Sequence, residues 1–168
     1  MERYIDENVD MGTSRRGTSV LGTTTFPRVI QCTWWTCGPC SVYSVLKFFN
    51  CEAEYTDVRR ALETTRARGT MEGPVVRCLS AHGLRVVRRQ SLSWVGLLTA
   101  LTAGSVVLVG LDAGKHYGVV YGYDPVRDVV YLADPSLRRL VGKRLSRLRF
   151  EARWATDGLI VRPPHRHH

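Results

Sequence analysis

Apolar residues recur at helical spacing through the first half of the chain. Between residues 41 and 49 they fall at i, i+3, i+4 and i+7, which predicts a helix that begins just after Cys37. Similar patterns predict a second helix capped by Thr56, a third over residues 74–81 and a fourth capped by Ser93. The first half of the chain therefore favours a set of short helices.

After residue 104 the pattern changes to runs of β-branched and aromatic residues, which are typical of buried strands. A polar turn at residues 124–128 joins two of these runs as a hairpin. The runs that predict strands are residues 84–88, 105–111, 116–123, 129–133 and 158–162. Helices followed by such strands indicate an α+β fold, with N-terminal helices packed on a C-terminal antiparallel sheet.

Length and composition are those of one globular domain. The chain has 168 residues, 44% of them hydrophobic and 23% charged, and no apolar run approaches the length of a membrane span. Residues 1–25 are polar and rich in Thr, Ser and Gly, so we expect a flexible N-terminal segment there. We expect residues 26–162 to form the folded domain and residues 163–168 a disordered tail.

The chain is strongly basic, with 24 Lys and Arg residues against 15 Asp and Glu and a formal net charge of +9. Residues 138–153 hold seven basic residues and one acid, Glu151. Such a stretch is usually a solvated face, and the alternative hypothesis is a docking site for an acidic carrier protein. No nucleic-acid-binding motif accompanies it, so nucleic acid is not an expected partner.

Cysteine is unusually clustered, and no secretory signal peptide precedes the cluster. We therefore expect a cytoplasmic protein with reduced thiols. In that setting clustered cysteines indicate a catalytic or a metal-binding role. The five cysteines are at positions 32, 37, 40, 51 and 78.

The sequence Cys-Gly-Pro-Cys at residues 37–40 has the spacing of a thioredoxin-type dithiol. An apolar strand precedes that motif in thioredoxins, whereas residues 31–36 are polar and aromatic, and the βαβ pattern is missing. A zinc site built on Cys32 and this motif would need a downstream ligand pair, which the sequence lacks. We therefore expect neither a metal nor a cofactor.

Cys37 stands at the predicted start of a helix, where backbone N–H groups and the helix dipole favour a nucleophilic thiolate. Such a nucleophile needs a histidine that accepts and returns its proton. His116 opens a predicted strand, at the rim of the sheet, whereas His82 ends a predicted helix beside a glycine and has a structural explanation. His116 is therefore the candidate base.

A third group should orient the imidazole of His116. If the strands pair through the 124–128 turn, Asp134 lies opposite about residue 118, close to His116. Asp124 is the rival carboxylate, but it lies at the far end of the hairpin. Asp134 is therefore the candidate orienting group.

These residues occur in the order of a known family. Gln31, then Cys-Gly-Pro from Cys37 and a helix, resembles the opening of the bacteriocin-processing cysteine peptidases, the double-glycine leader peptidases of the papain-like superfamily. The family's second motif is a His at the start of a strand, followed by an Asp-Pro. Residues 116–120 and the Ala-Asp-Pro at residues 133–135 resemble it. Their ending, a basic stretch, a Trp and a strand, is similar to residues 149–161.

The resemblance covers residues 26–162 and implies a stand-alone domain with the papain-like fold. It implies that Cys37 is the nucleophile, that His116 is the base and acid, and that Asp134 orients His116. It also implies that the side-chain amide of Gln31 donates to the oxyanion hole.

The leading hypothesis is a papain-like cysteine enzyme that attacks an amide or thioester carbonyl through a Cys-His-Asp triad, with peptide hydrolysis by a cysteine peptidase as its first form. An acyl or peptidyl transferase is the alternative, which would use the same triad on a carrier-bound or peptide substrate in natural-product or thiol-peptide metabolism. A binding module with a degenerate site is the second alternative, because Thr36 stands where the family usually has Asp.

Overall fold

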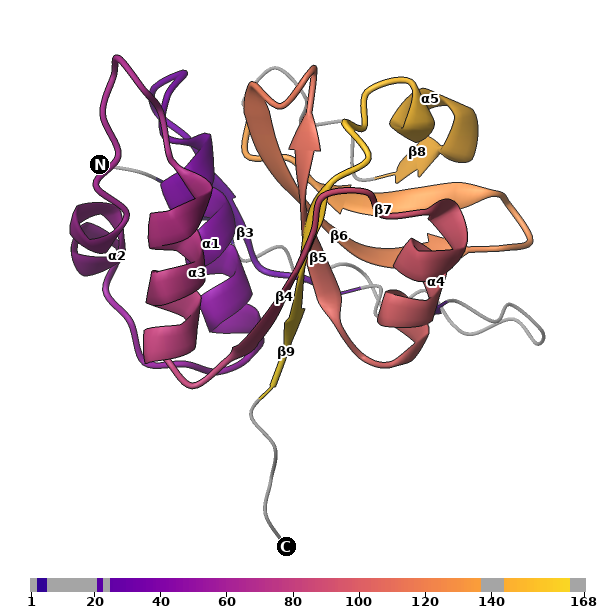
Figure 1. The fold of residues 1–168 in the computed structure, drawn as a ribbon, viewed down its shortest axis with the longest axis horizontal. Coiled ribbons are helices and arrows are strands. Elements are labelled where there is room, and N and C mark those ends of the chain that lie inside the picture. The colour runs from indigo at the N-terminus through magenta and orange to yellow at the C-terminus, as the bar shows by residue number, and fades with distance from the viewer. Residues whose placement is uncertain (1–2, 6–20, 23–24, 137–143, 164–168) are drawn as a thin grey trace, which may run out of the picture.

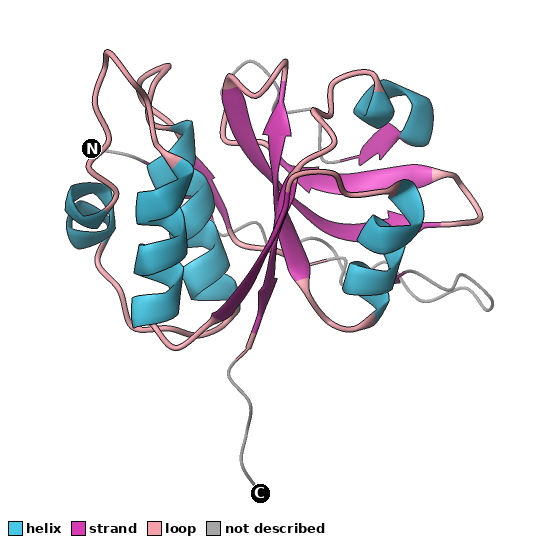
Figure 2. Cartoon of the chain, viewed as in Figure 1, coloured by secondary structure: helices cyan, strands magenta, loops and turns pink. Residues whose placement is uncertain are grey.

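The computed structural model describes residues 3–5, 21–22, 25–136 and 144–163. In this part of the chain a group of helices stands beside a strongly twisted sheet (Figure 1). Two further helices lie on the opposite side of the sheet from this group (Figure 2). The helices are α1 (Cys37–Phe48), α2 (Tyr55–Ala61), α3 (Glu72–Ala81), α4 (Trp94–Thr102) and α5 (Arg147–Glu151).

Within the described residues, the main sheet has seven strands, all paired antiparallel. Six follow the order β4-β9-β5-β6-β7-β8, and β2 pairs with β6. A separate two-stranded sheet joins β1 to β3. The strands are β1 (Arg3–Ile5), β2 (Leu21–Gly22), β3 (Arg28–Ile30), β4 (Arg85–Arg89), β5 (Val106–Leu111), β6 (His116–Asp124), β7 (Val129–Ala133), β8 (Arg144–Ser146) and β9 (Gly158–Arg162). The predicted α+β class is confirmed.

The second predicted helix begins differently from the prediction. Its N-cap is Glu54, whose side chain makes no capping hydrogen bond, so the prediction that Thr56 caps it is wrong. The ring of Tyr55 packs edge-on against Tyr43 of α1 at a centroid distance of 5.7 Å. We attribute the earlier start to this packing, because tertiary contacts outweigh a weak local capping preference.

The other helices follow the predicted pattern more closely. α1 begins at Cys37 itself, and α3 begins two residues before Pro74. Ser93 caps α4 as predicted, with its hydroxyl oxygen accepting from the backbone N–H of Gly96 at 3.0 Å. Gly104 follows α4 with a φ of +75°, a conformation that favours glycine after a helix end.

All five predicted strands are present, and β1, β2, β3 and β8 are additional. Two of the additional strands lie in residues 1–25, where a flexible segment was expected: residues 3–5 pair with β3 and residues 21–22 pair with β6. The rest of that segment lies outside the described residues, apart from residue 25. Residues 164–168 of the expected tail also lie outside them.

Strands β5, β6, β7 and β9 are buried on both faces, so they read as continuous apolar runs rather than alternating ones. On one face Val119 of β6 packs in a cluster with Val42 and Val45 of α1. On the other face the neighbouring residue Val120 packs in a cluster with Leu97 of α4. This packing holds α1 against β6 and thereby sets the position of the helix start relative to the strand start.

Candidate active site

Cys37 is the first residue of α1 and is buried, with 6% of its surface exposed. The residue before it, Thr36, is also buried, and its hydroxyl donates to the carbonyl oxygen of Thr33 at 3.1 Å. Thr36 therefore supports the turn that leads into α1.

Gly38 allows a close approach at the start of α1. A Cβ added to Gly38 would lie 2.2 Å from the hydroxyl oxygen of Thr70. The Thr70 hydroxyl also bonds the Thr64 hydroxyl at 2.8 Å. The loop that ends at Thr70 thus packs directly on the helix turn that carries Cys37.

Cys40 lies one turn into α1 and is fully buried. Its sulfur lies 3.8 Å from the hydroxyl of Tyr55 in α2. Neither Cys37 nor Cys40 forms a disulfide in this structure. Cys40 therefore has a packing role between α1 and α2.

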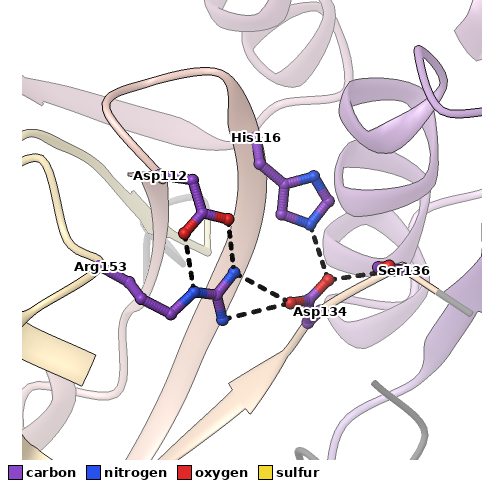
Figure 3. A network of polar contacts seen from close by, with 5 residues as sticks. All are labelled: Asp112, His116, Asp134, Ser136 and Arg153. Carbon is purple, nitrogen blue, oxygen red and sulfur yellow. Dashed lines mark hydrogen bonds and ion pairs between the residues drawn. The ribbon is translucent and has the colours of Figure 1, made fainter. Parts of the chain in front are cut away.

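His116 and Asp134 meet across the β6–β7 hairpin. Val119 pairs with Ala133, which places Asp134 opposite residue 118 as predicted, with a register shift further along the strands. The Nε2 atom of His116 lies 2.6 Å from Oδ1 of Asp134 (Figure 3). The two side chains are 14% and 2% exposed, so water screens this pair poorly.

Asp124 and His82, the other carboxylate and histidine considered from the sequence, make contacts that belong to the fold. Asp124, the rival carboxylate, is fully buried and accepts from the backbone N–H groups of Val126 and Arg127. It therefore forms the far turn of the hairpin. His82 ends α3, and its Nδ1 atom bonds the carbonyl oxygen of Cys78 at 2.8 Å.

Burial, Asp134 and Cys37 all affect the pKa of His116. Burial by itself lowers its pKa, but hydrogen bonds to Asp134 and Cys37 and the negative charges of both groups outweigh burial. Together they raise the pKa of His116 from 6.5 to about 9. Asp134 and Cys37 therefore both favour the charged form of His116.

Asp134 is held in its ionised form. Burial opposes ionisation, but the hydrogen bond and charge of His116, the backbone N–H of Ser136 and the charge of Arg153 together lower the pKa of the Asp134 carboxyl. Arg28 of β3, a 7% exposed cation, also interacts electrostatically with Asp134. Burial lowers the pKa of the Arg28 guanidinium, and Asp134 opposes that effect.

Gln31 lies beside the same strand end. Its backbone N–H donates to the carbonyl oxygen of Pro135 at 2.9 Å, which ties the end of β3 to the residue after Asp134. Its side chain is 8% exposed, and Oε1 has no hydrogen-bond partner among the described residues. The contact with Pro135 keeps Gln31 on the side of the molecule where Asp134 lies.

The basic stretch at residues 138–153 lies partly outside the described residues. Two of its described arginines have contacts within the fold. Arg147 pairs with Glu151 at 3.3 Å and stacks over the ring of Trp94. Arg153 pairs with Asp112 and with Asp134. Arg147 thus joins α5 to α4, and Arg153 joins the loop after α5 to Asp112 and Asp134, so neither side chain extends freely as a docking face.

Solved structures show which class of protein has this fold. A C39-like peptidase from Bacillus anthracis aligns with a TM-score of 0.69 and 15% identity, covering 88% of this chain and 100% of that one. A double glycine motif protease from an AMS/PCAT transporter, solved in complex with the leader peptide, aligns with a TM-score of 0.68 and 17% identity over 84% of this chain and 94% of that one. The peptidase domain of Streptococcus ComA aligns with a TM-score of 0.63 and 20% identity over 80% and 96%. The fold is that of the papain-like cysteine peptidases.

The family follows from the sequence. Residues 23–159 match the model of the Peptidase_C39 like family. Because this match spans most of the chain, the protein belongs to that family, as its resemblance to the double-glycine leader peptidases implied. No curated protein matches the sequence significantly. In the part of the chain that the structure describes, no helix is both long and apolar enough to cross a membrane.

Proposed function

We propose that this protein is a peptidase that cleaves a peptide amide bond with Cys37 as the nucleophile, His116 as the base and acid, and Asp134 as the group that orients His116. One observation carries the proposal. The ring of His116 bonds Asp134 at 2.6 Å, and Cys37 also acts on it, so one imidazole interacts with both a carboxylate and a thiol. A thiol and a base within hydrogen-bond reach, with a third group fixing the base, is the arrangement of an activated nucleophile.

The proposed reaction begins with a proton transfer. His116 takes the proton of the Cys37 thiol, and the thiolate attacks the carbonyl carbon of the scissile peptide bond. A pKa of about 9 keeps the His116 imidazolium stable at neutral pH beside the thiolate. The tetrahedral intermediate carries its negative charge on oxygen, where the backbone N–H of Cys37 and the side-chain amide of Gln31 are the proposed donors.

The second half releases the products. The His116 imidazolium gives its proton to the leaving amine as the C–N bond breaks, which leaves a thioester on Cys37. His116 then takes a proton from a water molecule, and the resulting hydroxide attacks the thioester. The peptide acid leaves and Cys37 recovers its proton, so each proton taken by His116 is returned.

Peptide is the proposed substrate class, and the cytoplasm is the proposed compartment. The family match supports a peptide bond as the target, and one similar structure holds a leader peptide. None of the five cysteines, all of which lie within the described residues, forms a disulfide, which is the usual state of thiols in a reducing compartment.

A peptide library derived from a whole proteome tests the proposal. New N-termini produced by the wild-type protein are identified by mass spectrometry, with Cys37→Ala as the inactive control and Cys40→Ala as the matched cysteine control. We expect cleavage by the wild type and by Cys40→Ala and none by Cys37→Ala. Equal products from Cys37→Ala contradict the proposed nucleophile, and products joined to an added amine indicate transfer instead of hydrolysis.

The proposed role of His116 as the base is tested by a comparison with His82. General acid–base catalysis contributes about 10²–10⁴-fold, so we expect His116→Ala to lose roughly that factor in kcat/KM. His82→Ala removes an imidazole that bonds the carbonyl oxygen of Cys78 in its own helix, and its kcat/KM should match the wild type. Similar rates for the two variants contradict the assignment of His116.

A further inference from the structure

The two oxygens of Asp134 have different partners. Oδ1 accepts from Nε2 of His116 at 2.6 Å and from the backbone N–H of Ser136 at 2.9 Å. Oδ2 faces Nη1 and Nη2 of Arg153, each at 3.4 Å (Figure 3). A carboxylate held on both oxygens has little freedom to rotate away from the imidazole.

Arg153 is itself held firmly. Its Nε and Nη2 atoms each donate to Asp112 over 2.9 Å, which is the two-point geometry of a strong arginine–carboxylate pair. Its backbone carbonyl accepts from the N–H of Asp112 at 2.8 Å. Only 16% of the Arg153 side chain is exposed, so the guanidinium is fixed between two carboxylates.

Asp112 belongs to the turn that leads into His116. It has a φ of +53°, and Ala113 follows with a φ of +60°, which is uncommon for residues other than glycine. Such a conformation persists where surrounding contacts maintain it. The contacts from Arg153 therefore stabilise the turn that delivers His116 to the site.

We propose that Arg153 is a positioning residue of the proposed peptidase site, which holds the Asp134 carboxylate toward His116 and anchors the preceding turn through Asp112. The proposal rests on the proposed function and deepens it. The hydrogen bonds and ion pairs of the Arg153 side chain in the described structure go to Asp112 and Asp134, so it acts on His116 through Asp134. It extends the site from three side chains to a chain of five: Cys37, His116, Asp134, Arg153 and Asp112.

The guanidinium has a specific advantage over another cation. Its planar fork pairs with Asp112 on one edge while it still faces Asp134, whereas a lysine ammonium is a point charge that lacks this geometry. Arg153→Lys therefore keeps a positive charge at this position but removes the two-point geometry of the guanidinium. We expect the lysine variant to recover only part of what Arg153→Ala loses.

Removal of Arg153 should also change the pH dependence. Among the groups that act on Asp134 are His116, the N–H of Ser136, Arg153 and the buried Arg28. Without Arg153 the pKa of the Asp134 carboxyl rises, so Asp134 loses its charge at a higher pH. The acid limb of the kcat/KM profile then moves to higher pH, and Arg28 limits the shift.

The test compares Arg153→Ala, Arg153→Lys and Asp112→Asn with Arg149→Ala, which removes an exposed arginine of α5. With the peptide best cleaved from the library, we expect Arg153→Ala to lose about 10–100-fold in kcat with KM unchanged, as is typical when a group that supports a functional residue is lost. The acid limb should move upward in Arg153→Ala and Asp112→Asn but not in Arg149→Ala. A folded Arg153→Ala with the kcat and pH profile of Arg149→Ala overturns the proposal.

An NMR measurement tests positioning without any turnover. The Nε2 proton of His116, assigned with His116→Gln, should give a strongly downfield signal in the wild type because of its short bond to Asp134. We expect this signal to broaden or vanish in Arg153→Ala and to persist in Arg149→Ala. If the wild type cleaves no peptide, the proposed function fails while this signal still tests the positioning. If Arg153→Ala does not fold, Arg153→Lys and Asp112→Asn carry the same test, and an unchanged signal in both overturns the proposal.

Discussion

At the scale of single residues, His116 joins two groups that favour its charged form. Its ring bonds Asp134 at 2.6 Å and also bonds Cys37, while burial opposes the imidazolium. The attraction of both groups outweighs burial and raises the pKa of His116 to about 9. A histidine whose pKa rises on folding makes the stability of the fold depend on pH.

We therefore expect the stability that His116 contributes to decline with rising pH. Its pKa is about 9 in the folded protein against 6.5 for an ordinary histidine, so the folded state binds the proton more tightly. The contribution is fully present below about pH 6.5 and is lost as the pH rises through about 9. Urea unfolding across this range should show the free energy of unfolding of the wild type approaching that of His116→Gln.

His82→Gln is the matched control, and its unfolding free energy should follow the pH dependence of the wild type. A constant difference between the wild type and His116→Gln across the whole range contradicts the raised pKa of His116.

At the scale of elements, the start of α1 packs closely against the loop before α3. Gly38 follows Cys37 and lies against Thr70, with space for a hydrogen atom but not for a methyl group. The loop before α3 therefore packs on the same helix turn that carries the proposed nucleophile. The orientation of that turn depends on this contact as well as on the packing of α1 against β6.

Gly38→Ala should destabilise the protein and lower its activity. The added methyl group would lie 2.2 Å from the Thr70 hydroxyl oxygen, so the loop or the helix start must move. Overpacking of this kind costs about 1–3 kcal/mol in the free energy of unfolding, measured by urea denaturation. Gly73→Ala in α3 is the control, because its Cβ meets only the end of the Arg77 side chain at 3.5 Å.

A double variant separates crowding from other effects. Thr70→Ala removes the atoms that the new methyl group meets, so Gly38→Ala combined with Thr70→Ala should recover part of the lost stability. Strictly additive losses in the double variant would show that the contact with Thr70 is not the cause.

At the scale of the whole molecule, the N-terminal residues complete two sheets. β1 pairs with β3, the strand that leads to Gln31, and β2 pairs with β6, the strand that begins at His116. Phe26 then stacks on Tyr121 of β6 at a centroid distance of 5.0 Å. Segments from the beginning of the chain thus contact the strand that precedes Gln31 and the strand that begins at His116.

Deletion of residues 1–22 should lower the melting temperature and speed amide hydrogen exchange in β3. The deletion leaves the edge of β3 without its partner strand and removes the pairing of Leu21 with Tyr123. Deletion of residues 164–168 is the control and should change neither. If exchange at residues 28–30 and the melting temperature are the same after the first deletion, the pairing of β1 with β3 does not contribute to stability.

Local patterns in the sequence predicted much of the fold and part of the candidate site. The apolar spacing in residues 41–49 predicted α1, and hairpin register predicted that Asp134 lies near His116. Both depend on residues close in sequence or joined by one short turn, where period and register are set locally. The prediction that Thr56 is the N-cap of α2 is wrong, because Tyr55 packs on α1, a contact that local capping patterns do not include.

The sequence by itself determined the helical and strand segments, the hairpin that joins His116 to Asp134, and the family to which the chain belongs. Only the tertiary structure decided that α1 lies against β6, so that Cys37 interacts with His116. It also decided the pairing of β1 and β2, and the contacts of Arg153 with Asp112 and Asp134. These contacts join segments far apart in the chain, so they form only when burial of the shared core offsets the entropy of closing long loops.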